Sequence, residues 1–161
     1  MNKNKKIMSI FLLLVCLFCG AFAWYFLHTS PAKDELKEDT QAVGYDPKIK
    51  KPKNFDSKQV ALPGFSQISV KEGDKTASIA LANPSFNHVY FKYIITFDKT
   101  KEKLLETDLI SPGKAVKSLP LPKNITPGRY TLTITIKTYD KKNKSELNGG
   151  SNKVPLVVLE K

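Results

Sequence analysis

The sequence predicts an all-β extracytoplasmic domain, a sandwich of seven short strands, carried behind one N-terminal transmembrane helix and a disordered tether. Three observations support this prediction. Residues 7–27 form an apolar run without a charge, and residues 28–58 are polar and carry charges of both signs. Beyond them, apolar and polar residues alternate with the period of two that is typical of strands, and no ten-residue stretch has a convincing helical face.

The apolar run is long enough to cross a membrane. At about 1.5 Å per helical residue it spans roughly the 30 Å of bilayer hydrocarbon. Lys3, Lys5 and Lys6 precede it, so residues 1–6 should be a cytoplasmic tail and the C-terminal part should lie outside the cell. We therefore expect a cell-membrane protein with a single span, which works as a signal anchor.

Cleavage of the anchor is the alternative. Ala21-Phe22-Ala23 has the small-x-small form of a signal-peptidase site, but Trp24 and the three residues after it continue the apolar run. The chain's two cysteines, Cys16 and Cys19, lie inside the run, so a disulfide in the exported part is excluded. Exported domains without disulfides are more typical of Gram-positive bacteria than of eukaryotic secretion.

Residues 28–58 predict a flexible tether because they hold too little apolar surface to bury. Residues 59–161 should then form one β-domain. Its two clearest strands are 89–97 and 130–137, where β-branched and aromatic residues alternate with polar ones. Five shorter strands are expected at 67–70, 78–82, 103–107, 114–119 and 153–159.

Turn residues separate these strands. Pro112-Gly113, Pro127-Gly128 and Asn148-Gly149-Gly150 supply breakers where the periodicity stops, and the last of them is expected to be a turn. Pro120 and Pro155 cannot donate ladder hydrogen bonds, so their strands should be edge strands or end nearby. Seven short strands at regular spacing favour an immunoglobulin-like sandwich.

A tyrosine near one turn sharpens that prediction. Gly128-x-Tyr130-x-Leu132 resembles the start of strand F in immunoglobulin domains, where the tyrosine hydroxyl bonds back to the chain upstream. Leu132 stands where those domains have a cysteine, so the disulfide-bonded antibody subtype is excluded. The alternative is an ordinary half-buried aromatic residue at a strand start.

The chain as a whole resembles the small membrane-anchored, extracytoplasmic β-sandwich proteins of low-GC Gram-positive bacteria. The resemblance covers residues 62–159 and rests on short motifs: Leu62-Pro63-Gly64-Phe65, Asn83-Pro84, Tyr90-Phe91, Pro112-Gly113-Lys114-Ala115, Gly128 with Tyr130, and Tyr139-Asp140. It implies a location and a fold. It implies no catalytic residue, cofactor or metal.

The chain's own residues predict no enzyme, cofactor or metal site. His28 and His88 are its two histidines, and neither belongs to a catalytic or metal-binding motif. Glu102, Glu106 and Asp108 could in principle act as paired carboxylates, but lysines surround them and charges of both signs are usual on an edge strand.

Charge and topology suggest where partners bind. The chain carries a net charge of +11, which favours anionic surfaces such as wall polymers or lipid headgroups, with Lys141, Lys142 and Lys144 as candidate contacts. Near-absence of arginine argues against nucleic acid. If the sandwich forms, the segments 83–88 and 141–152 should share one end. Candidate partner-binding residues there are Phe86, His88, Asn148, Gly149 and Gly150.

Phe86 has two interpretations: an exposed anchor for a partner, or, as we favour, a cap on the bottom of the core. The function expected is a non-catalytic binding or assembly module of a bacterial cell-envelope complex, with an envelope protein as partner. The alternatives are an inhibitor or chaperone-like protector of an envelope protein, and a basic domain that binds wall polymer.

Overall fold

The computed structural model describes residues 15–22, 24, 36–47, 51–56 and 58–161. The chain divides into two units, Met1–Glu35 and Leu36–Lys161, each described here by itself. Residues 15–22 are helical. No helix among the described residues is long and apolar enough to cross a membrane. Most of the predicted anchor 7–27, together with residues 28–35 of the predicted tether, lies outside the described residues.

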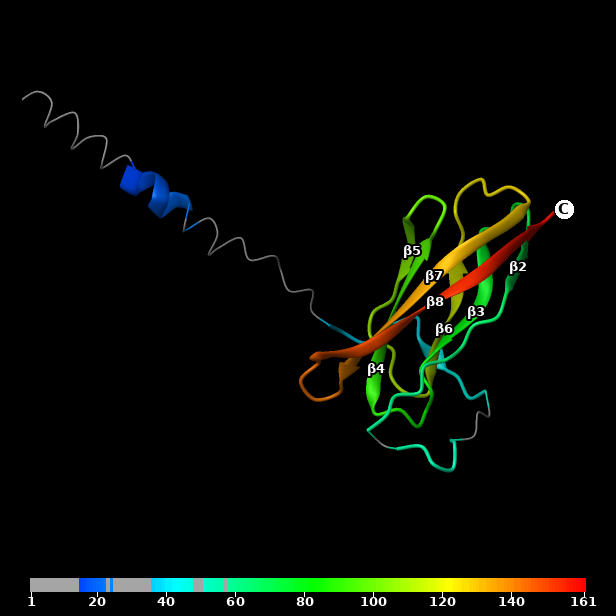
Figure 1. The fold of residues 1–161 in the computed structure, drawn as a ribbon, viewed down its shortest axis with the longest axis horizontal. Helices are drawn as coiled ribbons and strands as arrows, with labels where there is room; N and C mark the ends of the chain where they lie inside the picture. The colour runs from blue at the N-terminus through cyan, green and yellow to red at the C-terminus, as the bar shows by residue number, and fades with distance from the viewer. Residues whose placement is uncertain (1–14, 23, 25–35, 48–50, 57) are drawn as a thin grey trace, which may run out of the picture. The chain divides into compact units, whose positions relative to one another are not determined.

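The unit Leu36–Lys161 consists of two β-sheets (Figure 1). One sheet has three strands in the order β1-β6-β3, and the other has five in the order β2-β8-β7-β4-β5. The strands are β1 (Val43–Gly44), β2 (Ile68–Lys71), β3 (Thr76–Ala82), β4 (Val89–Phe97), β5 (Glu102–Glu106), β6 (Lys114–Pro120), β7 (Gly128–Asp140) and β8 (Glu146–Leu159). The prediction of an all-β fold is confirmed.

The two clearest predicted strands form the middle of the larger sheet. β4 covers the predicted residues 89–97, and its side chains alternate strictly between buried and partly exposed. β7 pairs with it antiparallel along its whole length, from Val89 opposite Asp140 to Phe97 opposite Leu132. The period of two in the sequence arises because one face of each strand contacts the core and the other does not.

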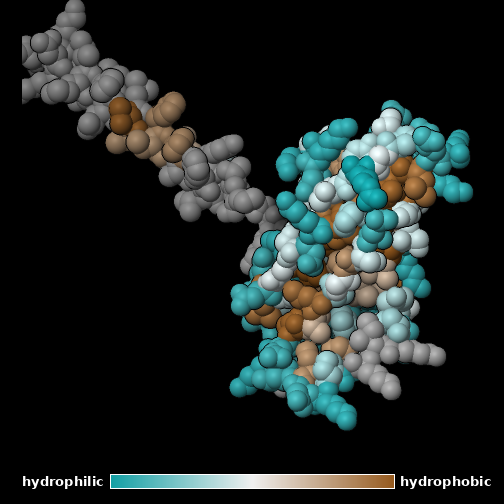
Figure 2. Space-filling view, turned by 45° about the vertical axis from the view of Figure 1, so that its right-hand side comes forward, coloured by the Kyte–Doolittle hydropathy of each residue, from teal (hydrophilic) through white to brown (hydrophobic). Residues whose placement is uncertain are grey.

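Both sheets contribute to one hydrophobic core. Phe91, Tyr93 and Ile95 of β4 are fully buried, as are Leu81 of β3 and Leu119 of β6. The Tyr93 hydroxyl keeps a partner at this depth, because it donates a hydrogen bond of 2.6 Å to the carbonyl oxygen of Ala82. Burial raises the pKa of Tyr93 far above its usual range, so its phenol stays neutral. Figure 2 shows that some hydrophobic residues are also exposed on one face of the unit, between two ends that are covered mostly by hydrophilic residues.

The tyrosine hydroxyl bond expected at the start of β7 is present. Tyr130 donates to the carbonyl oxygen of Thr126 at 3.0 Å and also lies 3.0 Å from the Thr126 hydroxyl. Its ring packs against Phe97, with the ring centroids 5.4 Å apart. Gly128 has a φ of 150°, a conformation open to glycine, at the turn that positions this tyrosine.

The predicted turn at Asn148-Gly149-Gly150 is wrong, because all three residues belong to β8. This strand begins at Glu146 and not near Lys153, so the connection from β7 is the five-residue turn 141–145. The pairing of β7 with β8 shifts register between Ile136 and Thr138, which marks a bulge opposite the glycines. Glycine residues in a strand can serve a bulge as well as a turn, and the sequence pattern does not separate the two.

The proline rule holds for one strand and fails for the other. β6 ends at Pro120, as expected. β8, however, lies between β2 and β7 and is not an edge strand. It tolerates Pro155 because β2 pairs with it only from Leu156 onward, so the proline meets no neighbour on that side.

The tether prediction is wrong for residues 36–47, which belong to the folded unit. The amide of Asp39 donates to the Leu109 carbonyl at 2.8 Å, and the Leu109 amide donates to the Lys37 carbonyl at 2.9 Å. Val43 and Gly44 then form β1 against β6. This polar segment is ordered mainly by backbone hydrogen bonds, which hydropathy does not report.

Candidate functional site

The segments chosen from the sequence for partner binding do meet at one end of the unit. Val89 at the start of β4 lies opposite Asp140 at the end of β7, so loop 83–88 and turn 141–145 are neighbours. Leu36, the first residue of the unit, reaches the same place, because the Lys144 ammonium donates a hydrogen bond to its carbonyl oxygen. We call this region the Leu36 end. Of the predicted segments 83–88 and 141–152, the first and residues 141–145 of the second share this end, whereas residues 146–152 belong to β8.

Loop 83–88 is held rigid by two buried asparagines. The Asn83 amide nitrogen donates to the carbonyl oxygens of Val89 at 2.8 Å and Ile110 at 2.9 Å. Asn87 donates to the Asn83 side chain at 3.0 Å, and its own oxygen accepts from the Ala61 amide at 2.9 Å. These bonds satisfy buried polar groups and fix the loop to three other segments.

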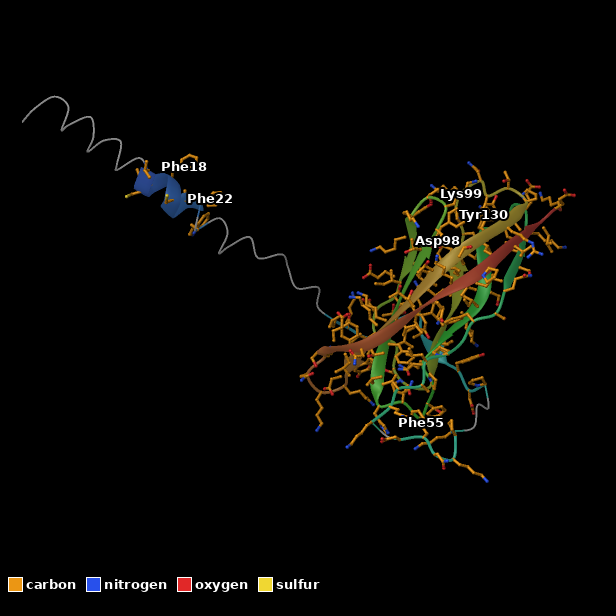
Figure 3. All side chains as sticks on the ribbon, viewed as in Figure 1. Phe18, Phe22, Phe55, Asp98, Lys99 and Tyr130 are labelled. Carbon is orange, nitrogen blue, oxygen red and sulfur yellow. The ribbon has the colours of Figure 1, made fainter. Side chains whose placement is uncertain are left out.

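Phe86 lies on this loop, half-buried, and packs against Phe55 from the segment 51–56. The two rings meet edge to face with their centroids 5.1 Å apart, and the Lys51 ammonium lies 5.6 Å from the Phe55 ring centroid. The main core cluster does not include Phe86 among the described residues. Neither sequence interpretation of Phe86 describes this aromatic pair, which Figure 3 locates by its Phe55 label. His88 is exposed beside it.

Turn 141–145 presents its lysines on a well-defined backbone. The Asp140 carboxylate accepts hydrogen bonds from the amides of Lys142 at 2.8 Å and Asn143 at 3.1 Å, and these bonds lower the pKa of Asp140. Lys144 adopts a left-handed backbone with a φ of 54°. Lys141, Lys142 and Lys144 are all exposed. The turn therefore displays three ammonium groups at the Leu36 end.

Asn148, Gly149 and Gly150 have a structural role in β8. The Asn148 carbonyl accepts a hydrogen bond of 2.7 Å from the Thr138 hydroxyl. A Cβ added to Gly149 would overlap the carbonyl oxygen of Ile136, and one added to Gly150 would come within 2.7 Å of Leu62. Gly149 allows two backbones to approach closely and Gly150 makes room for the Leu62 side chain, so their presence does not by itself indicate a binding loop.

The carboxylates near β5 form ion pairs. Glu106 accepts from the Lys92 ammonium at 2.8 Å and also contacts Lys103. The hydrogen bonds from Lys103 and Lys92 lower the pKa of Glu106 to about 2, so it cannot serve as a proton donor near neutral pH. Within the part of the chain that the structure describes, no three His, Cys, Asp or Glu side chains are grouped as metal ligands.

The opposite end of the unit holds a group of residues that the sequence reasoning missed. Here β4 leads into β5 and β7 begins at Gly128, and we call this the Gly128 end. Asp98, Lys99, Arg129, Tyr130, Thr131 and Lys153 line a shallow depression of about 510 Å³. One signal was present in the sequence: Arg129 is the single arginine beside 25 lysines.

Comparison with known proteins found no matching family model, no matching curated protein and no matching solved structure. Function is therefore inferred from this chain's own residues and their geometry.

Proposed function

We propose that this protein is a single-pass membrane protein whose Leu36–Lys161 unit is an extracytoplasmic, non-catalytic binding module of a cell-envelope complex. The observation that carries the proposal is the convergence at the Leu36 end. A half-buried aromatic pair, Phe55 with Phe86, lies there beside exposed His88 and the lysines of turn 141–145. Aromatic side chains surrounded by a polar rim are typical of protein-binding surfaces.

An immunoglobulin-like topology is part of the proposal. Two features support it. The strand order β8-β7-β4-β5 corresponds to the G-F-C-C′ order of such domains, and the adjacent β6 and β3 correspond to strands E and B. The Tyr130 hydroxyl bonds back to Thr126, as the conserved tyrosine of strand F does. Domains of this class commonly bind partners through loops at the ends of the sandwich.

The proposed membrane attachment rests on the apolar run 7–27 of the sequence. Eight residues, 28–35, separate this run from the unit that begins at Leu36. Eight residues span at most about 29 Å when fully extended. An envelope protein in the same membrane is therefore the partner that the proposal favours.

Wall polymer is the second candidate partner, because the chain carries a net charge of +11 and exposes Lys141, Lys142 and Lys144. A role as inhibitor or chaperone-like protector of an envelope protein would use the same aromatic surface. The dependence of binding on ionic strength distinguishes a polymer partner from a protein partner. Binding by lysines alone should weaken strongly as ionic strength rises, whereas a packed aromatic interface should largely survive.

Photo-crosslinking in living cells tests the proposal. A photoreactive amino acid replaces His88 or Lys142, both exposed at the Leu36 end, in the full chain. The matched control is Ser118, an exposed residue of β6 in the other sheet. Products are identified by mass spectrometry.

We expect one defined membrane or envelope protein from His88 and Lys142 and no such product from Ser118. Equal yields from all three positions, or no protein product from His88 and Lys142, would contradict the proposed surface. Smeared polymer adducts that disappear in high salt would favour the wall-polymer candidate.

A further inference from the structure

The depression at the Gly128 end gathers three cations from segments far apart in the sequence. Lys99 comes from the turn between β4 and β5, Arg129 from the start of β7, and Lys153 from β8. Together with the one carboxylate, Asp98, they leave a net charge of +2 in a space of about 510 Å³. Figure 3 shows Asp98, Lys99 and Tyr130 near one another at this end.

Hydrogen bonds and ring contacts position the polar groups. The Asp98 carboxylate accepts from the Thr133 hydroxyl at 2.6 Å, and the Asp98 amide donates to the Thr131 carbonyl at 3.0 Å. The Lys99 ammonium lies 5.4 Å from the centroid of the Tyr130 ring. The negative charge in the depression is therefore tied to the sheet, and one cation is held over an aromatic face.

Arginine differs from lysine in what it recognises. Its planar guanidinium donates paired hydrogen bonds that match a phosphate or carboxylate, and lysine supplies a compact point charge. The single arginine in a chain with 25 lysines lines the depression together with two of those lysines, and this combination suits an oxyanion ligand. Since the depression is shallow and lined by residues of three segments, a ligand can pass across it rather than enter it.

We propose that this depression binds phosphate groups of an anionic envelope polymer, with Arg129 binding one phosphate and Lys99 and Lys153 flanking the polymer. The identity of the polymer rests on the proposed function, but the binding site stands on the geometry alone. The site is distinct from the lysines of turn 141–145, which lie at the other end of the unit.

The depression is well separated from the lysines of turn 141–145. The β4 strand runs from Val89, opposite Asp140 at the Leu36 end, to Phe97, next to Asp98 of the depression. Eight steps along a strand cover about 26 Å. The two groups of cations are therefore separate candidate contacts for an anion.

A binding measurement with matched variants tests the inference. The full chain in lipid nanodiscs with uncharged headgroups is titrated with a synthetic poly(glycerol phosphate), and Kd is measured by calorimetry. The variants are Arg129→Gln and Lys153→Gln, and the controls are Lys58→Gln and Lys117→Gln, which remove equal charge outside the depression. All four residues are exposed, so thermal unfolding should show an unchanged fold.

We expect Arg129→Gln to raise Kd about tenfold or more, Arg129→Lys to recover only part of that loss, and the controls to change Kd less than threefold. Absence of binding, or equal effects of the depression variants and the control variants, would overturn the inference. Binding of poly-glutamate as tight as that of poly(glycerol phosphate) would also overturn it, because that result would indicate an acidic peptide as ligand. Tighter binding of the protein to nanodiscs of anionic lipid than to the polymer would indicate lipid headgroups and would overturn it as well. Failure here leaves the crosslinking result at the Leu36 end unaffected.

Discussion

Glu106 holds two lysines on the outer face of the larger sheet. Its contact with Lys92 matters more than the one with Lys103, because the Lys92 side chain is 12 % exposed and the Lys103 side chain 57 %. Burial lowers the pKa of Lys92, but the hydrogen bond and charge of Glu106 outweigh that effect, and the net shift is upward. A partly buried ammonium thus keeps its charge because one carboxylate is aimed at it.

The pKa of Glu106 makes stability depend on pH. The folded-state pKa of Glu106, about 2, lies below the ordinary glutamate pKa of 4.5. A lowered pKa stabilises the fold above pH 4.5, and this contribution is lost as pH falls toward 2. The Glu106 side chain is 31 % exposed, so solvent screening reduces the contribution to about 1 kcal/mol.

We therefore expect Glu106→Gln to lower the free energy of unfolding by about 1 kcal/mol at pH 7, measured by urea denaturation. The difference from the unchanged protein should shrink between pH 4.5 and pH 2. Glu102→Gln, at an exposed position of the same strand, is the control and should change little. A difference that stays constant down to pH 2 would contradict the ionic origin.

At the scale of single residues, the sequence predicted where residues lie in the fold better than which residues they contact. Phe86 and His88 could be placed near turn 141–145 because fold analogy says which connections share an end. Phe55 was unpredictable as a partner of Phe86, since it lies in a polar stretch that reads as tether. The depression around Arg129 could not be predicted either, because its residues are distant in the sequence and only the pairing of the strands brings them together.

At the scale of elements, the bulge in β8 explains why a glycine is needed where no turn exists. Gly149 lies opposite the register shift between Ile136 and Thr138 of β7. Its missing side chain lets the two backbones approach, because a Cβ there would overlap the Ile136 carbonyl. The β7 backbone cannot move easily here, since β4 pairs with it from Leu132 to Asp140 on its other side.

Gly149→Ala should therefore destabilise the fold by about 2 kcal/mol or more, as expected when extra volume is forced into a tight site. Gly44→Ala in β1 is the matched control, because an added Cβ there has nothing within 4 Å. Thermal unfolding followed by circular dichroism compares the two. Similar melting temperatures for both variants would show that the bulge relaxes without cost.

The elements that the sequence predicted well are those in which packing imposes a period. β4 and β7 alternate because one face of each contacts the core. β1 has two residues, both exposed, so it carries no period to detect. Residues 146–149 at the start of β8 are exposed, so they show no alternation of apolar and polar residues. The glycines there therefore led to the prediction of a turn.

At the scale of the whole molecule, the folded unit begins at Leu36 and not near residue 59. Glu38 strengthens this earlier boundary, because its carboxylate accepts a hydrogen bond of 2.8 Å from the Ser111 hydroxyl. The hydrogen bond from Ser111 lowers the pKa of Glu38. A segment rich in charge can thus be part of a folded unit when the unit offers partners for its backbone and side chains.

A fragment of residues 36–161 should consequently be more stable than one of residues 59–161. The shorter fragment loses three backbone hydrogen bonds to Leu109 and Gly113, worth about 3 kcal/mol together. Its Tm should be lower by about 10 °C or more. The full chain in detergent serves as the control and should match 36–161. Equal Tm values for the two fragments would place the boundary where hydropathy put it.

The parallel pairing of β2 with β8 decides when the unit can fold. Ile68 of β2 lies opposite Leu156 of β8, 88 positions later in the chain, and β8 follows every other strand. A ribosome makes the chain from its N-terminus, so β2 has no neighbour in its sheet until the last strand has emerged. Contacts so distant in sequence close late and slowly. If the protein is exported through a translocation channel during synthesis, the unit should therefore cross as an unfolded chain and complete its fold after it has left the channel.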